Sequence, residues 1–316
     1  MDITEFDLIS RIGARVRQRT DVVLGIGDDA ALLQVPPGQQ LVVTADTLNA
    51  GVHFPQATAP ADIGWKALAV NLSDLAAMGA APAWCTLSLS LPQTDESWIE
   101  AFLDGFLGLA DQHAIALVGG DTTRGPLSVS VTAMGLVEAG SALRRDRAQA
   151  GDDVWVTGTL GDAAAALEAL LEGREFPESS RRRLDRPTPR VAAGLRLSAL
   201  AHACIDVSDG LLADLAHICE RSGVAAEIRL TELPASAHLA SVESAKRWRW
   251  QACGGDDYEL CFTASPRNRD LIVQALDFAD VSATRIGRII AGQGVRALDE
   301  EAKEWLPPSR GYEHFA

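Results

Sequence analysis

Gly25-Ile26-Gly27-Asp28-Asp29 directly follows the apolar run Val22-Val23-Leu24, so two flexible glycines deliver two adjacent carboxylates at the end of a predicted strand. Glycine tolerates positive φ and lets the backbone approach another group closely. Adjacent carboxylates repel each other unless a positive charge lies between them, and a divalent cation meets that need. Taken alone, this turn is either a metal site or a structural bend.

Further aspartates lie in similarly apolar surroundings. Asp46 ends a strand predicted over 41–46, and Asp121 follows the apolar strand 115–118 and the turn that begins at Gly119. Asp74 lies inside a helix predicted over 62–78, where it and Asn71 interrupt a stripe of small apolar residues. Burial of an unpaired carboxylate is costly, so Asp74 needs a cation or several hydrogen-bond donors. A paired structural aspartate is the alternative interpretation.

Length and charge limit the class of protein. With 316 residues, two domains are expected, and a basic turn at 144–152 separates residues 1–140 from residues 150–316. The net charge of −15 argues against a nucleic-acid partner, because nucleic-acid binding requires a basic patch or stripe. Surface acidity alone would produce the same net charge.

Cysteine usage and hydropathy bear on the compartment. The five cysteines form no C-x-x-C pair, which is typical of reduced thiols in the cytoplasm. The acidic N-terminus lacks the apolar segment of a signal peptide. No apolar run approaches the ~20 residues of a membrane-spanning helix, so we expect a cytoplasmic protein with no membrane partner.

The order of predicted elements in the first domain favours an α+β layer rather than a doubly wound parallel sheet. That order is helix 4–16, strands 22–26 and 41–46, helix 62–78, strand 84–91, helix 95–113, and strands 115–118 and 127–137. In the second domain, an exposed connection over 173–190 separates the helix 162–172 from later strands and helices. These include strand 204–207, helices 211–221 and 266–277, and strands 282–290 and 294–298.

Polar residues also cluster around the strand that ends at Val207. Asp206 and Ser208 alternate and therefore face the same side of the strand end, while Asp209 is a metal ligand or a simple helix N-cap. The later Gly254-Gly255-Asp256 repeats the chemistry of the Gly119 turn. Arg145 either binds a phosphate or is a solvated surface group.

Together these segments resemble the thiamine-monophosphate kinases over nearly the whole chain, in order and at matching spacing. The motifs are Gly-Ile-Gly-Asp-Asp at 25–29, Asp46-Thr47-Leu48, His53-Phe54, the helix 66–79, Gly-Gly-Asp-Thr-Thr at 119–123, Asp-Val-Ser-Asp-Gly-Leu at 206–211 and Gly-Gly-Asp-Asp-Tyr-Glu-Leu at 254–260. The wider superfamily includes aminoimidazole ribonucleotide synthetase and selenophosphate synthetase. Selenophosphate synthetases need a reactive cysteine or selenocysteine near the N-terminus, and no cysteine precedes Cys85.

The resemblance implies a two-domain α+β fold, with an N-terminal α+β domain that binds metal and ATP and dimerises through its sheet, and a C-terminal α/β domain. It implies a homodimer that transfers the ATP γ-phosphoryl group in line to thiamine monophosphate, giving thiamine diphosphate, with several Mg²⁺ ions. The attacking phosphate oxygen is already ionised at neutral pH, so no catalytic side chain is expected. Catalysis then reduces to positioning and charge neutralisation.

The resemblance also assigns residues. The metal ligands would be Asp29, Thr44, Ala45, Asp46, Asp74, Asp121, Asp206 and Asp209. ATP would meet Gly120, Asp121, Arg145 and Ser208, and thiamine monophosphate would meet His53, Asp256 and Tyr312.

This sequence departs from the family pattern at two positions. Ala45 stands where threonine is usual, which matters only if a hydroxyl rather than a backbone carbonyl binds the metal. Asp256 stands where glutamate is usual, and Asp257 or Glu259 would be the neighbours able to compensate. Two alternatives stay open: a superfamily enzyme with another phosphoryl acceptor, and a non-catalytic acidic module that binds metal or nucleotide.

Overall fold

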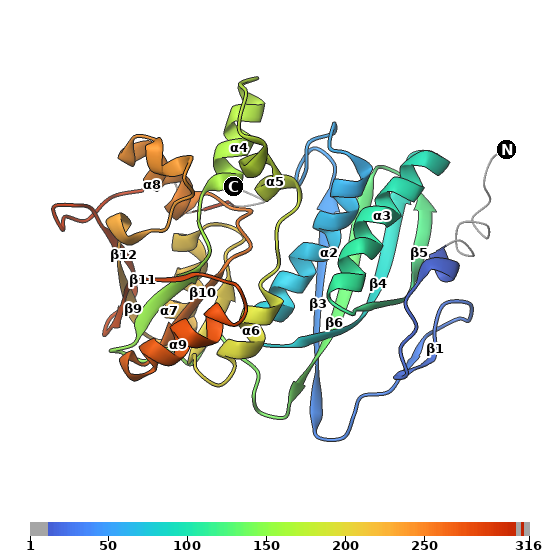
Figure 1. Cartoon of the computed structure of the whole chain (residues 1–316), viewed down its shortest axis with the longest axis horizontal. Helices are drawn as coiled ribbons and strands as arrows, with labels where there is room; N and C mark the ends of the chain where they lie inside the picture. Colours follow the sequence, from blue (N-terminus) through green and yellow to red (C-terminus); the bar gives the residue numbers. More distant parts are fainter. Residues whose placement is uncertain (1–11, 308–310, 313–316) are drawn as a thin grey trace. The chain divides into compact units, whose positions relative to one another are not determined.

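The computed structural model describes residues 12–307, 311 and 312 of the chain (Figure 1). It forms two compact units: residues 1–75 with 80–140, and residues 76–79 with 141–316. Most of the helix predicted over 4–16 lies outside the described residues. Each unit has its own sheet, and the two-domain α+β class expected from the sequence is confirmed.

The first unit is built on a four-stranded sheet of order β3-β6-β4-β5. Its strands are β3 (Gln39–Asn49), β4 (Ala81–Leu91), β5 (Ala116–Arg124) and β6 (Ser128–Glu138). β6 pairs antiparallel with both β3 and β4, and β4 pairs parallel with β5. β3 and β5 therefore form opposite edges of the sheet.

Helices α2 (Pro60–Ala77) and α3 (Glu96–Gln112) lie next to each other in this unit (Figure 1). A Cβ atom at Gly64 would lie 2.1 Å from the Phe102 carbonyl oxygen, and one at Gly105 would lie 1.8 Å from that of Ala61. Only glycine permits so close an approach of two helix backbones. A side-chain hydrogen bond from Thr44 to Asp74 links α2 to β3.

The opposite face of the sheet is only partly covered. A hairpin of β1 (Val22–Leu24) and β2 (Leu32–Leu33) packs there around Trp84, with Val118 and Met134 in the same cluster. Along β3, alternate residues stay exposed on this face, including Leu41 at 44% and Val43 at 56%. An open apolar strip therefore runs along one edge of the sheet.

Three strands of the first unit are longer than the sequence predicted, among them β4, which begins at Ala81 instead of Trp84. β3 continues to Asn49, and β5 runs through the residues expected to form a turn at 119–126. The β4–β5 register shifts between Cys85 and Thr86, and Gly120 adopts φ +152° with its α-carbon against the Leu87 carbonyl. The glycines thus accommodate a bulge within a continuous strand. The turn predicted over 119–126 is therefore wrong over 119–124, and the chain bends at 125–127.

The second unit contains a six-stranded sheet of order β12-β9-β11-β7-β10-β8. The strands are β7 (Asp153–Thr157), β8 (Ala203–Asp206), β9 (Ala225–Arg229), β10 (Leu260–Ala264), β11 (Ala283–Ile290) and β12 (Gly294–Leu298). Among the described strand pairs of this six-stranded sheet, only β9 and β12 are parallel. Helices and strands alternate along this half of the chain, yet they do not build the parallel sheet of a typical α/β domain.

Helices cover this sheet. They are α4 (Asp162–Leu171), α5 (Glu178–Asp185), α6 (Val191–Leu197), α7 (Leu211–Ser222), α8 (Ser244–Cys253) and α9 (Arg269–Asp277), with short 3₁₀ turns η1 (Leu230–Glu232), η2 (Leu239–Ser241) and η3 (Pro266–Asn268). Leu211 and Leu215 of α7 share a core with Val154 and Val156 of β7. Trp155 lies on the opposite face of β7 and stacks on Phe262.

The segment 173–190 is not the simple exposed connection that its proline, arginine and glutamate content suggested. It contains α5, whose Ser180 and Leu184 are buried. α8 is a second element that the sequence pattern did not reveal. In both cases the tertiary contacts override a polar composition with weak periodicity.

Candidate active site

Asp46 and Asp74 form an acidic pair between β3 and α2. The Thr44 hydroxyl donates to Asp74, and burial together with the nearby Asp74 charge raises the pKa of Asp46 to about 6. The expected ligands Thr44, Asp46 and Asp74 are thus brought together within the first unit. Two close carboxylates and a hydroxyl are hard oxygen donors, which is the chemistry that Mg²⁺ selects.

Ala45 points away from this pair. Along β3, Thr44 and Asp46 are half-buried, whereas Ala45 is exposed on the other face. A threonine side chain at position 45 would also point away from Asp74. Any ligand role at this position therefore falls to the backbone carbonyl.

Asp121 and Gly120 lie at the other edge of the same sheet. The register aligns Asp46 with Val131 of β6, and Asp121 with Ser88 of β4. Two strands separate β3 from β5, so the backbones at Asp46 and Asp121 are about 14 Å apart. Within one sheet these two aspartates cannot bind the same ion. In the described part of the chain, no group of three or more His, Cys, Asp or Glu side chains is arranged to hold a metal ion.

Asp28 and Asp29 occupy the exposed loop between β1 and β2. The Asp28 carboxylate accepts a 2.8 Å hydrogen bond from the Asp29 N–H, and Gly27 has φ +121°. The Asp28 carboxylate therefore shapes the turn, in line with the interpretation of this segment as a structural bend. Asp29 stays exposed.

His53 lies in the turn after β3. Its Nδ1 accepts a 3.0 Å hydrogen bond from the Asn49 N–H, so a neutral ring carries its proton on Nε2. Lys66 of α2, only 2% exposed, donates to the His53 carbonyl at 3.1 Å. Sequence reasoning missed Lys66 as a support of this turn, although a lysine in an apolar helix was a usable signal.

In the second unit, the turn at Ser208 and Asp209 is held by Asp214. One oxygen of the buried Asp214 carboxylate accepts from the N–H groups of Ser208, Asp209 and Gly210 at 3.0, 3.1 and 3.1 Å. Burial, followed by the charge of Asp209, raises the pKa of Asp214 to about 7. Asp214 was also missed, because an acid in the first turn of a helix looks like an ordinary dipole partner.

Two segments distant in sequence join this turn. The Asp256 N–H donates to the Ser208 carbonyl at 2.9 Å, and the Tyr312 N–H donates to the Asp209 carbonyl at 3.2 Å. The Tyr258 hydroxyl donates to the Asp256 carboxylate at 3.1 Å. The structure therefore gathers four of the predicted site residues at this turn: Ser208, Asp209, Asp256 and the half-exposed Tyr312.

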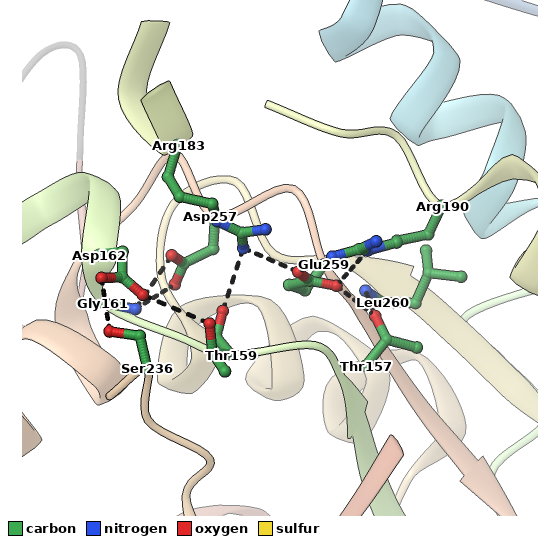
Figure 2. A network of polar contacts seen from close by, with 10 residues as sticks. All are labelled: Thr157, Thr159, Gly161, Asp162, Arg183, Arg190, Ser236, Asp257, Glu259 and Leu260. Carbon is green, nitrogen blue, oxygen red and sulfur yellow. Dashed lines mark hydrogen bonds and ion pairs between the residues drawn. The ribbon is translucent and has the colours of Figure 1, made fainter. Parts of the chain in front are cut away.

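Asp257 and Glu259 cannot compensate for the shorter Asp256 side chain. They are 2% and 0% exposed, and their carboxylates are engaged in the polar network of Figure 2. Compensation at these positions was therefore a wrong expectation. Both side chains lie in the protein interior.

Asp206 and Arg145 complete the predicted set in this unit. Asp206 ends β8, is 3% exposed and lies opposite Leu260 of β10. Arg145 is exposed, and its carbonyl accepts a 2.8 Å hydrogen bond from Ser222.

No helix in the described part of the chain is both long and apolar enough to span a membrane.

Comparison with known proteins agrees with these features. The N-terminal domain of AIR synthase related proteins matches residues 27–137, and the C-terminal domain of the same group matches residues 149–300. The chain therefore belongs to the AIR synthase related family and, within it, to the thiamine-monophosphate kinases. It is an enzyme of that class, a phosphotransferase with a phosphate group as acceptor.

The relatives support this placement over the full length. Thiamine-monophosphate kinase from Escherichia coli strain K12 is 47% identical, covering 99% of this chain and 98% of its own. The crystal structure of thiamine-monophosphate kinase from Stenotrophomonas maltophilia K279a is 61% identical over 94% of this chain and 97% of that one, with a TM-score of 0.88. The AaThiL complex with AMPPCP and TMP is 34% identical over 99% and 97%, with a TM-score of 0.78.

Proposed function

We propose that this enzyme transfers the γ-phosphoryl group of ATP directly to the phosphate of thiamine monophosphate, giving thiamine diphosphate and ADP. The observation that carries the proposal is the gathering of Asp256 and Tyr312 at the Ser208–Asp209 turn. Two of the three residues assigned to the acceptor thus adjoin the turn that carries Ser208, which is assigned to the nucleotide. A structure of a 34% identical relative, AaThiL, contains both AMPPCP and TMP.

The reaction needs no general base, because the attacking phosphate oxygen is already ionised at neutral pH. The chemical problem is the repulsion between two polyanions, so the site must position them and neutralise their charge. Mg²⁺, when bound, supplies that neutralisation. In the first unit Asp29, Asp46, Asp74 and Asp121, with the Thr44 hydroxyl and the Ala45 carbonyl, are the proposed metal ligands, and Asp206 and Asp209 serve the second unit.

Nucleotide contacts are assigned to Gly120, Asp121, Arg145 and Ser208. The Ser208 N–H is already bonded to Asp214, so its hydroxyl is the group offered to ATP. On the acceptor side, His53, Asp256 and Tyr312 are assigned to thiamine monophosphate. Each assigned side chain binds or orients substrate or metal, and none exchanges a proton with it.

We further propose that the enzyme is a cytoplasmic homodimer that associates through the sheet of its first unit. The exposed strip of Leu41 and Val43 supports the interface, because edge strands with apolar faces favour association. The five cysteines are all buried thiols outside disulfide bonds, which suits a reducing compartment. The net charge of −15 speaks against a nucleic-acid partner.

A coupled ADP-release assay tests the activity. With ATP and Mg²⁺, we expect ADP to form only when thiamine monophosphate is added, and ³¹P NMR to show a diphosphate ester. Aminoimidazole-pathway substrates and selenide serve as control acceptors. ADP release with one of these but not with thiamine monophosphate would assign a different superfamily reaction. Metal binding without ADP formation under any condition would favour a non-catalytic module.

A further inference from the structure

Glu259 is the centre of a buried ion cluster in the second unit (Figure 2). Its carboxylate accepts hydrogen bonds from Arg190 Nε and Nη2 at 2.6 and 2.5 Å, from Arg183 Nη2 at 2.7 Å and from the Thr157 hydroxyl at 2.7 Å. The Thr157 hydroxyl oxygen in turn accepts the Leu260 N–H at 2.8 Å. The buried Glu259 carboxylate is thus bound by two guanidinium groups and by the hydroxyl of Thr157, the last residue of β7.

The charges in this cluster favour an ionised Glu259. Burial alone would raise its pKa, but hydrogen bonds and charge from Arg190, together with the charge of Arg183, lower it below the ordinary value. Replacing a bidentate partner of a buried charge is expensive, because the remaining charge loses its compensation. The cluster therefore strongly stabilises one arrangement of the segments that carry Thr157, Arg183, Arg190 and Glu259.

A second anchor lies two residues earlier. Both oxygens of buried Asp257 accept from the Gly161 N–H, at 3.0 and 2.9 Å, and Arg183 reaches the Thr159 carbonyl at 3.1 Å. Figure 2 shows Arg183 between Asp257 and Glu259. Asp257 and Glu259 thus fix the loop 254–259 from its interior side.

The residues that alternate with these anchors adopt strained backbone conformations. Asp256 has φ +67° and Tyr258 has φ +49°, values in the left-handed region that residues other than glycine rarely adopt. Such conformations persist only where the surrounding structure over-determines them. Here they direct the Asp256 N–H to the Ser208 carbonyl and the Tyr258 N–H to the Val207 carbonyl.

We propose that Arg190 and Arg183 are positioning residues for the phosphoryl acceptor. Through Glu259 they hold the loop 254–259 in the conformation that presents Asp256 beside the Ser208–Asp209 turn. The inference rests on the proposed function, in which Asp256 contacts thiamine monophosphate. It assigns to the polar segment 173–190 a role in acceptor affinity.

The test compares Arg190→Gln with a matched variant, Arg269→Gln. Arg269 binds the buried Asp153 carboxylate through Nε and Nη2 at 2.6 and 2.7 Å, with Arg285 as the second arginine. This second cluster lies at the opposite end of the β7–β10 pair, where Asp153 faces Ala264. Each substitution therefore removes a bidentate contact to a buried carboxylate at one end of the β7–β10 pair; the Arg269 side chain is 45% exposed and that of Arg190 is 15% exposed.

For Arg190→Gln we expect the KM for thiamine monophosphate to rise about tenfold, because misplacing a positioning group weakens acceptor contacts. The KM for ATP should change less than about twofold, since Asp214 holds the Ser208–Asp209 turn independently. Arg190→Lys keeps the positive charge but cannot form the bidentate contact to Glu259, so it should give an intermediate KM for thiamine monophosphate. Arg269→Gln should lower the Tm while leaving both KM values as in the wild type.

Equal acceptor KM values in Arg190→Gln, Arg269→Gln and the wild type would overturn the proposal. If Arg190→Gln does not fold, Arg190→Lys is measured instead. A folded Arg190→Lys variant with the wild-type KM for thiamine monophosphate would also overturn the proposal. Failure of the proposed function is recognised separately, because the wild type would then release no ADP in response to thiamine monophosphate.

Discussion

At the scale of single residues, the acidic pair of the first unit makes the sharpest prediction. Asp46→Asn and Asp74→Asn should each lower kcat on the order of 10³-fold, because each removes charge that holds metal and phosphate in place. Both variants should fold, since each removes a carboxylate from a place where burial, followed by the charge of Asp74, raises the pKa of Asp46. ADP release and thermal unfolding measure the two effects, and near-wild-type turnover in either variant would contradict the metal assignment.

Asp28→Asn is the internal control for that prediction. The Asn side-chain oxygen can still accept the Asp29 N–H, so the turn is retained and we expect a milder loss, about tenfold or less. A loss as large as that of Asp46→Asn would show that Asp28 carries a charge-dependent role. At this scale the sequence identified chemically suitable residues but did not reveal their supports, Lys66 and Asp214. Both bond to backbone atoms of nearby turns, and the conformation of those turns is not written in residue types.

At the scale of elements, the α2–α3 contact depends on glycine. Gly105→Ala should destabilise the protein by about 2–4 kcal/mol, because the added methyl would meet the Ala61 carbonyl at 1.8 Å. Gly108→Ala, on the same helix, has open space around it and should stabilise by about 0.5–1 kcal/mol through helix propensity. Denaturant unfolding compares the two, and equal free-energy changes would show that the helices can separate at no cost.

The link between α4 and α8 predicts a pH effect. Burial would raise the pKa of Glu168, but hydrogen bonds from Trp250, Lys246 and Arg249 outweigh it and lower the pKa to about 2, from an ordinary 4.5. This stabilisation is complete above pH 4.5 and is lost as the pH falls toward 2. It amounts to on the order of 2 kcal/mol.

Glu168→Gln should therefore lower the free energy of unfolding at pH 7. It should also make the decrease of that free energy between about pH 5 and pH 2 smaller than in the wild type. Glu301→Gln, which removes an exposed pair with Lys303, should leave the profile unchanged. Urea unfolding at several pH values measures both variants. A Glu168→Gln profile parallel to the wild type would contradict the prediction.

At the scale of the whole molecule, self-association through the first sheet is the main prediction. Val43→Lys should weaken the dimer at least about 100-fold without unfolding it, because it places a charge on the exposed apolar strip of β3. Val273→Lys, at a 46% exposed site on α9, should leave the dimer intact. Sedimentation equilibrium distinguishes them, and a monomeric wild type would refute the interface.

The sequence by itself determined the class of fold, because apolar periodicity and turn chemistry are local properties. The family and the residue types of the site followed from motifs that resemble those of the thiamine-monophosphate kinases. It could not determine the length of β5, since a glycine-rich turn and a glycine bulge look the same until a neighbouring strand pairs. Nor could it separate Asp256 from Asp257 and Glu259. Only the tertiary structure did, because the arginines that bury Glu259 come from a segment about 70 residues away.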